Sequence, residues 1–252
     1  MNATARPANP DPLTPPSGSS DGPRPAPRSL RMSLKRGLAR QAMDQARAAD
    51  ADLGRIFEAL AAAAPNATAG DRALRRLMRT RGVVRAARSA ATGAIRITAR
   101  SVRGVEARRD GLALFAETGL LYTRIEVART RTGPAFRIVR LSFSTHALER
   151  LVERTDEDLR PILPTIDAEA VSGLAQVAGN LTLSDRDDDY LTSRHGLWAG
   201  SLDLTSPEED WSVVPVDPEA GLPIFSVRTF LSEDEMRATA WLKWSDARRP
   251  PG

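Results

Sequence analysis

The chain has 252 residues, 41% of them hydrophobic, and a formal net charge of +4, which fits one good-sized domain or two small ones. It contains no cysteine and two histidines, so disulfides and thiolate metal sites are excluded and a structural zinc site is disfavoured. No apolar run approaches the ~20 residues needed to cross a bilayer, and the N-terminus lacks the apolar core of a signal peptide. We therefore expect a cytoplasmic protein that has no resident metal or cofactor and does not act at a membrane.

Positive and negative charges are separated along the chain. Residues 28–109 contain 19 basic and 6 acidic side chains, a net charge of +13, whereas residues 155–252 contain 8 basic and 19 acidic side chains, a net charge of −11. All but two of the 36 basic residues are arginine. A basic region of this kind can bind nucleic acid. The alternative is that the two regions neutralise each other by docking.

The N-terminal part of the chain predicts helices. Residues 1–28 contain eight prolines, which is typical of a disordered leader. Apolar side chains at helical spacing predict a helix over residues 30–64. Asp71 can cap a second helix that runs to about Ala91. Together these segments predict a basic helical region over residues 29–92.

The period of the pattern changes after Gly93. Alternating apolar and polar residues predict strands from Ile95, over 111–117, over 121–127 and over 136–143, with a tight turn at Thr118-Gly119. Thr165 can cap a further helix, and three more strands are expected over 196–204, 211–216 and 223–231. A capping box from Ser232 to Glu235 predicts a last helix. The expected fold class is α+β, in which the helical N-terminal region is followed by an antiparallel sheet domain with packed helices over residues 93–252.

The most informative segment is the run from Ser144 to Arg154. Ser144 or Thr145 can cap a helix that follows the strand directly. On that helix His146, Arg150 and Arg154 are four residues apart and share one face, while the apolar residues lie opposite. Because an imidazole transfers protons near neutral pH and guanidinium groups bind phosphate in a fork, this face is suited to phosphate chemistry.

This run also resembles a known group of domains. The predicted strand ends in Ser144, and the helix continues as x-His146-Ala147-x-x-Arg150-x-x-x-Arg154. This junction resembles the one in the barnase/EndoU/colicin E5-D/RelE-like (BECR) nuclease-like domains, and in related bacterial domains with a Ser-x-His-Ala-x-x-Arg helix. The resemblance covers roughly residues 143–231. It implies a helix with His and Arg beside an antiparallel sheet, and a Thr or Ser from a final strand, which corresponds here to Thr229.

The implied chemistry is cleavage of RNA without a metal ion. A base removes the proton of the ribose 2′-OH, cations stabilise the phosphorane, and an acid protonates the leaving oxygen. The catalytic candidates are His146, Arg150, Arg154 and Thr229. The alternative is that these charges form a solvated helix face with surface ion pairs. His195 could be a second acid or base, but an exposed loop position is the favoured interpretation.

Two further clusters have similar alternatives. Arginines on the second predicted helix can contact phosphates non-specifically, and we select Arg75, Arg76, Arg79 and Arg85 as the nucleic-acid-binding candidates. The acidic residues 185–189 could hold Mg²⁺ or Ca²⁺, although a solvated turn is favoured.

We therefore expect a metal-independent ribonuclease-like or nucleic-acid-processing domain of a toxin or mobile element, with RNA and an acidic protein as the expected partners. The alternative is a non-catalytic binding or regulatory module on the same scaffold, whose charge halves mediate self-association or partner docking.

Overall fold

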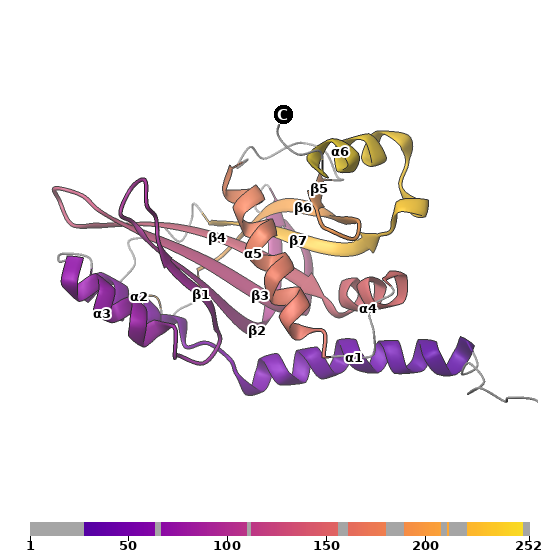
Figure 1. The fold of residues 1–252 in the computed structure, drawn as a ribbon, viewed down its shortest axis with the longest axis horizontal. Coiled ribbons are helices and arrows are strands. Elements are labelled where there is room, and N and C mark those ends of the chain that lie inside the picture. Colours follow the sequence, from indigo (N-terminus) through magenta and orange to yellow (C-terminus); the bar gives the residue numbers. More distant parts are fainter. Residues whose placement is uncertain are drawn as a thin grey trace, which may run out of the picture.

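The fold was analysed in a computed structural model, which describes residues 28–63, 67–109, 112–155, 161–179, 189–207, 211 and 221–248. The helices are α1 (Arg28–Ala48), α2 (Leu53–Ala63), α3 (Ala67–Leu77), α4 (Thr145–Arg154), α5 (Leu163–Gly179) and α6 (Ala238–Arg248), with the short 3-10 helix η1 (Glu233–Glu235). The strands are β1 (Val83–Arg88), β2 (Ile95–Arg109), β3 (Leu112–Arg129), β4 (Pro134–Ser144), β5 (Asp189–Thr192), β6 (Leu197–Thr205) and β7 (Leu222–Leu231). This arrangement confirms the α+β prediction, including helices that precede the sheet (Figure 1).

The seven strands form one sheet in the order β1-β2-β3-β4-β7-β6-β5. Neighbouring strands are antiparallel except β4 and β7, which run parallel. The sheet is therefore mixed, and the expectation of a purely antiparallel sheet was wrong at this pair. A further pairing joins β2 to β6, so that β2, β3, β4, β7 and β6 curl into a closed ring.

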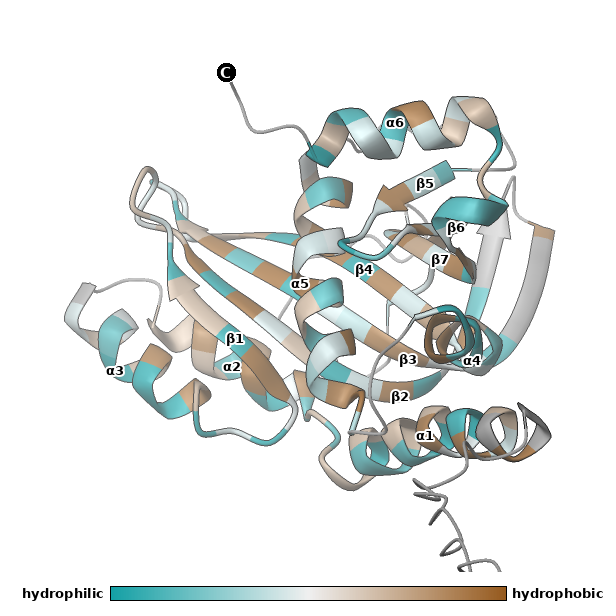
Figure 2. Cartoon of the chain, turned by 45° about the vertical axis from the view of Figure 1, so that its right-hand side comes forward, coloured by the Kyte–Doolittle hydropathy of each residue, from teal (hydrophilic) through white to brown (hydrophobic). Residues whose placement is uncertain are grey.

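The outer face of this ring is covered by helices. α5 crosses the face, and α1 and α4 lie beside it (Figures 1 and 2). The core between them combines small residues of α1, the apolar face of α4 and large side chains of the strands. Phe143, Trp198 and Phe230 stack edge to face, with ring centroids 4.8 Å apart in both pairs. These aromatic contacts join β4, β6 and β7 in the core that also contains the apolar face of α4.

The inner face has a second core at the β1 end of the sheet. There α2 and α3 pack beside β1 (Figure 2), and Ile56, Phe57 and Leu60 are fully buried against residues of β2, β3 and β4. Away from α2, the inner face lies inside the ring and is rich in buried serine and threonine.

Two predicted boundaries were wrong for physical reasons. The helix expected from an Asp71 cap to Ala91 is instead α3, Ala67–Leu77, so Asp71 lies within the helix rather than at its N-cap, and β1 follows. Gly82 has φ +72° and approaches Ala51 so closely that an added Cβ would lie 2.6 Å from it, so only glycine fits the turn that leads into β1. The turn expected at Thr118-Gly119 is absent, because β3 continues through it. Gly119 instead allows close approach to β4, since a Cβ there would lie 3.2 Å from the carbonyl oxygen of Phe143.

Candidate active site

The helix that carries the histidine begins where the sequence predicts. Ser144 is the N-cap, and its hydroxyl accepts a hydrogen bond of 3.0 Å from the backbone N–H of Ala147. Ala147, Leu148, Leu151 and Val152 are buried against the outer face of the sheet. His146 is exposed in the first turn. The strand-to-helix junction therefore holds the imidazole at the rim of the curled sheet.

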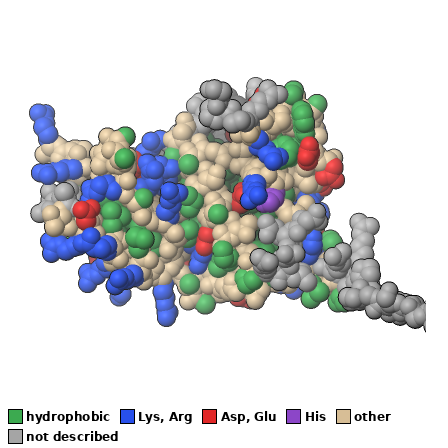
Figure 3. Space-filling view, viewed as in Figure 1, with side chains coloured by type: hydrophobic (Ala, Val, Ile, Leu, Met, Phe, Trp, Pro, Cys, Tyr) green, Lys and Arg blue, Asp and Glu red, His purple; other side chains and the backbone are tan. Residues whose placement is uncertain are grey.

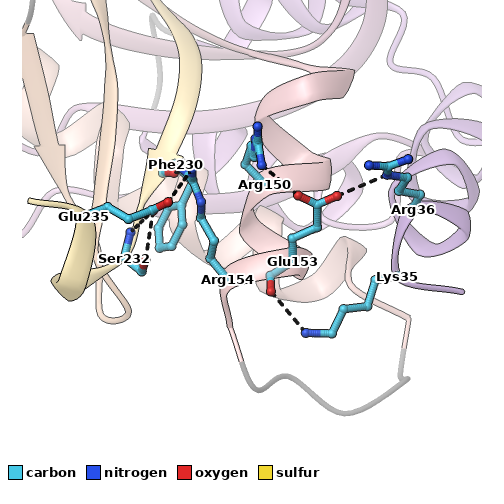
Figure 4. Close-up of polar contacts among 8 residues, drawn as sticks. All are labelled: Lys35, Arg36, Arg150, Glu153, Arg154, Phe230, Ser232 and Glu235. Atoms are coloured by element: carbon cyan, nitrogen blue, oxygen red, sulfur yellow. Dashed lines mark hydrogen bonds and ion pairs between the residues drawn. The ribbon is translucent and has the colours of Figure 1, made fainter. Parts of the chain in front are cut away.

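The two arginines of this helix contact protein groups. Arg150 lies 3.0 Å from a Glu153 carboxylate oxygen, and the other oxygen of Glu153 lies 3.1 Å from Arg36 of α1. Arg154 donates to the carbonyl oxygen of Phe230 and forms an ion pair of 2.6 Å with Glu235 (Figure 4). These contacts join α4 to α1, β7 and η1, which gives both arginines a structural role.

A carboxylate and a different arginine accompany the histidine. Gly119 of β3 pairs with Ser144, which places Glu117 near the start of α4. Loss of hydration raises the pKa of Glu117 above its ordinary value, although the charges of His146 and Arg228 act in the opposite direction. The strand pairings thus bring a carboxylate, an imidazole and a guanidinium to one rim of the ring.

Arg228 lies at an irregularity of the sheet. Ala199 of β6 pairs with Thr229, but the next residue, Gly200, pairs with Val227, so Arg228 is an extra residue in the register. Such bulges redirect a side chain and are frequent beside active sites. The guanidinium of Arg228 donates to the Ser201 hydroxyl at 3.1 Å, and that hydroxyl donates to a buried Asp203 oxygen at 2.5 Å. This chain of contacts holds Arg228 against the inner face.

The remaining sequence candidates are more dispersed. Thr229 is half-buried, and its hydroxyl has no hydrogen-bond partner in the part of the chain that the structure describes. His195 is exposed between β5 and β6, where its backbone N–H donates to the Ser193 hydroxyl. Residues 185–188 lie outside the described residues. Among the residues that the structure describes, no three His, Asp or Glu side chains are placed to hold a metal ion.

The nucleic-acid candidates lie at the opposite end of the molecule. Arg75 and Arg76 lie on the last turn of α3, Arg79 follows it, and Arg85 is on β1; all four are exposed. None forms an ion pair with another described residue. Figure 3 shows basic side chains gathered over this end, where α2, α3 and β1 lie. The ion pair from Arg100 to Asp167 joins the two charge regions and supports internal docking there.

Arg85 also borders a small groove between the sheet and α5. The groove has a volume of about 80 Å³ and includes Arg96 and Arg124 in its lining. Both of these arginines pair with Glu126, at 3.3 and 3.1 Å. Desolvation alone would raise the pKa of Glu126, but hydrogen bonds from Arg124 and Arg96 outweigh it and hold the pKa below its usual value. Three arginines line the groove, and two of them share the Glu126 carboxylate, so the groove retains positive charge.

Sequence reasoning missed Glu117 and Arg228, because neither belongs to a local motif. Comparison with protein-family models, with curated proteins and with solved structures finds no match for this chain. None of the helices in the described ranges is long and apolar enough to cross a membrane.

Proposed function

We propose that this protein is a ribonuclease-like domain that cleaves RNA with Glu117, His146 and Arg228. The observation that carries the proposal is the placement of these three residues at the rim where β3, β7 and α4 meet, since Gly119 pairs with Ser144 close to Glu117 and Phe143 pairs with Val227 next to Arg228. A carboxyl group with a raised pKa, beside an imidazole and a guanidinium in a shared site, is typical of acid–base catalysis. The resemblance of the His146 helix to BECR nuclease-like domains supports the same chemistry.

Each of the three groups has a defined role in the reaction. The Glu117 carboxylate accepts the proton of the ribose 2′-OH, and the 2′-oxygen forms a bond to phosphorus. Arg228 stabilises the negative charge that develops on the phosphorane oxygens. His146 donates a proton to the 5′-oxygen as the P–O5′ bond breaks, which leaves a 2′,3′-cyclic phosphate and a 5′-OH.

The arginines of α4 have a different part in this proposal than the sequence suggested. Arg154 positions α4 through Glu235 and the Phe230 carbonyl, and Arg150 does so through Glu153. Arg75, Arg76, Arg79 and Arg85 contribute a surface for the RNA backbone.

The alternative function is a non-catalytic binding or regulatory module on the same scaffold. The carboxylate partners of Arg150 and Arg154 favour it, because phosphate must compete with them for both guanidinium groups.

Cleavage of labelled single-stranded RNA separates the two functions. The wild-type protein should produce cyclic-phosphate ends in EDTA, and Glu117→Gln and His146→Ala should each lower the rate by about 10²- to 10⁴-fold, as expected when a general acid or base is removed. Arg228→Gln should lower both the rate and the affinity. Matched controls are Glu58→Gln, His195→Ala and Arg237→Gln, which change exposed residues on other elements.

The same assay can refute the proposal. If the wild-type protein cleaves no RNA across the pH range, in EDTA or with Mg²⁺ restored, the binding module becomes the better explanation. If cleavage is present but His195→Ala abolishes it while His146→Ala does not, the wrong histidine has been chosen.

A further inference from the structure

The groove between the sheet and α5 is a second candidate site, which the proposed reaction does not use. Arg85, Arg96 and Arg124 line it together with Thr98 of β2 and Ala175 of α5. Its volume of about 80 Å³ is several times the ~10–15 Å³ that one water molecule needs, but far below the ~300 Å³ at which pockets for drug-sized ligands begin. The groove therefore fits one charged group of a larger ligand, and not a whole organic molecule.

The three arginines belong to one face of the sheet. Arg85 of β1 pairs with Thr98 of β2, which in turn pairs with Arg124 of β3, so these residues form a row across three strands. Arg96 is two residues from Thr98 in β2 and shares its face. α5 crosses this face (Figures 1 and 2), and its Leu174 carbonyl oxygen accepts a hydrogen bond of 3.4 Å from Arg124. Strand pairing therefore gathers the guanidinium groups beside α5.

The groove keeps an excess of positive charge that a ligand can reach. Arg96 donates to Glu126 through its Nε at 3.3 Å, and Arg124 donates to the same oxygen at 3.1 Å. The terminal nitrogens of Arg96 have no hydrogen-bond partner among the described residues, and this side chain is 40% exposed. Arg85 is exposed and makes no ion pair within the described ranges. Three positive charges against one negative charge leave a net charge of +2 at the groove.

α5 adds no negative charge to the groove. Its two acidic side chains contact other partners, since Asp167 binds Arg100 and Glu169 accepts a hydrogen bond from the indole of Trp198. Residues 170–179, the part of α5 that borders the groove, contain no acid. An anion in the groove therefore meets no repelling carboxylate on the helix side.

The groove provides no platform on which a nucleobase could stack. β1 and β2 contain no aromatic residue. Tyr122 of β3 is fully buried, and Phe136 of β4 packs against Phe57 on the inner face, with ring centroids 5.9 Å apart. Bases are bound by aromatic stacking or through their edges, whereas contacts to the phosphate backbone carry no sequence information. The groove is therefore suited to a phosphate rather than to a base.

We infer that this groove holds one backbone phosphate of a single-stranded nucleic acid and does not read its bases. The phosphate oxygens accept hydrogen bonds from the fork of Arg96 and from Arg85, while Arg124, which Glu126 and α5 hold in place, adds charge. The ligand is a polymer, because the groove takes only one group and Arg85 lies next to the exposed basic side chains of α3. The inference rests on the proposed function for the class of its ligand, and it adds a contact that requires no 2′-OH.

Fluorescence anisotropy with labelled oligo(dT) and oligo(dC) of about 12 nucleotides tests this inference on the full chain. DNA lacks the 2′-OH that the proposed reaction requires, so binding is measured without cleavage. Both oligonucleotides should bind with a Kd of about 10⁻⁴ M or tighter at physiological salt, which is the range of non-specific binding. Their affinities should agree within about 5-fold, because only phosphates are contacted.

Arginine variants locate the contact. Arg85→Gln combined with Arg96→Gln should weaken binding at least ~10-fold and make the slope of log K against log salt shallower by about 0.7, the contribution of one phosphate. Arg96→Lys keeps the charge but loses the fork, so it should weaken binding at least ~3-fold without changing that slope. The control is Arg47→Gln combined with Arg237→Gln, which removes the same charge from exposed positions elsewhere and should leave the affinity within ~2-fold of wild type.

A second pair of variants approaches the groove from α5. Ala175 is exposed on this helix, so a longer side chain should not disturb the fold. Glu and Gln have nearly the same size, but Ala175→Glu brings a carboxylate into the groove. Ala175→Glu should therefore bind oligo(dT) at least ~10-fold more weakly than Ala175→Gln, because the phosphate would meet a like charge at short range.

The results that overturn this inference differ from those that overturn the ribonuclease proposal. The inference is wrong if neither oligonucleotide binds, if the two affinities differ by more than about 5-fold, or if the double Gln variant of Arg85 and Arg96 binds like its control. It is also wrong if Arg96→Lys binds like wild type or if the two Ala175 variants bind alike. RNA cleavage without DNA binding would overturn this inference alone, whereas DNA binding without RNA cleavage would overturn the ribonuclease proposal alone.

Discussion

Asp167 makes a buried polar contact between α5 and the sheet, and its removal has a calculable cost. Asp167 of α5 accepts hydrogen bonds from Arg100 of β2, at 2.5 and 2.6 Å, and from the Tyr122 hydroxyl of β3, at 2.7 Å. The side chain of Arg100 is 10% exposed, and Tyr122 is fully buried. Burial raises the pKa of Tyr122 well above its ordinary value, and the neighbouring Asp167 charge adds to this effect. Tyr122 therefore remains a hydrogen-bond donor throughout the neutral range.

Asp167→Ala would leave a nearly buried cation and a buried hydroxyl without this partner. Breaking a buried ion pair costs about 3–5 kcal/mol, and an unsatisfied buried hydroxyl costs about 1–3 kcal/mol. The two effects overlap because Arg100 and Tyr122 share one acceptor. We therefore expect the free energy of unfolding to fall by about 4 kcal/mol. At about 2–4 °C per kcal/mol for a chain of this size, the melting temperature should fall by about 8–16 °C.

Urea unfolding followed by circular dichroism measures this loss, and an unchanged m-value would show that the denatured state is the same. The matched control is Asp44→Ala, which breaks the exposed pair between Arg47 and Asp44. That change should cost less than about 1 kcal/mol. A loss below about 1 kcal/mol for Asp167→Ala would refute the reasoning, because it would mean that water replaces the carboxylate and that the site is less buried than the structure indicates.

Two further predictions concern the catalytic rim and the basic surface. The pKa of Glu117 is raised in the folded protein, so this group supports the fold below its unfolded pKa and loses that contribution as the pH rises through its folded pKa. Glu117→Gln should therefore become more stable relative to wild type as the pH rises above about 4, where an unperturbed Glu ionises. Melting temperatures that differ by a constant amount across the pH range would contradict this. A variant in which Arg75, Arg76, Arg79 and Arg85 are changed to Gln should bind single-stranded RNA more weakly. Its slope of log K against log salt should be shallower by up to about 3, at about 0.7 for each phosphate that the protein no longer neutralises. Equal binding by the variant and the wild type would favour internal docking of the basic region.

The sequence predicted the features that depend on neighbouring residues. Ser144 caps α4 as expected, and the capping box at Ser232 and Glu235 is present in η1. β4, β6 and β7 lie within one or two residues of their predicted bounds, because period-2 alternation is a local property. The predicted last helix is interrupted, since η1 ends at Glu235 and α6 starts at Ala238.

Features that depend on distant residues were not predicted. β3 is one long strand because both β2 and β4 pair with it along most of its length, and no local signal distinguishes this from two strands with a turn. The parallel pairing of β4 with β7 and the pairing of β2 with β6 join segments far apart in the sequence. Glu117 and Arg228 reach the His146 rim only through these pairings, so no spacing rule could have selected them.

The alternation of apolar and polar residues that predicted the strands gave no sign that their polar face would be buried. A strand with Ser226 between Phe225 and Val227 is usually half-exposed, with serine facing water. Here Ser226 is 2% exposed and Thr123 is 0% exposed, because the ring closes over the face that would otherwise be solvated. Apolar residues at these positions would make the closed ring more stable, since they would leave no buried donor unsatisfied. The buried hydroxyls of Ser101, Thr123 and Ser226 therefore lower the stability of the closed ring, and no alternation rule separates them from hydroxyls that face water.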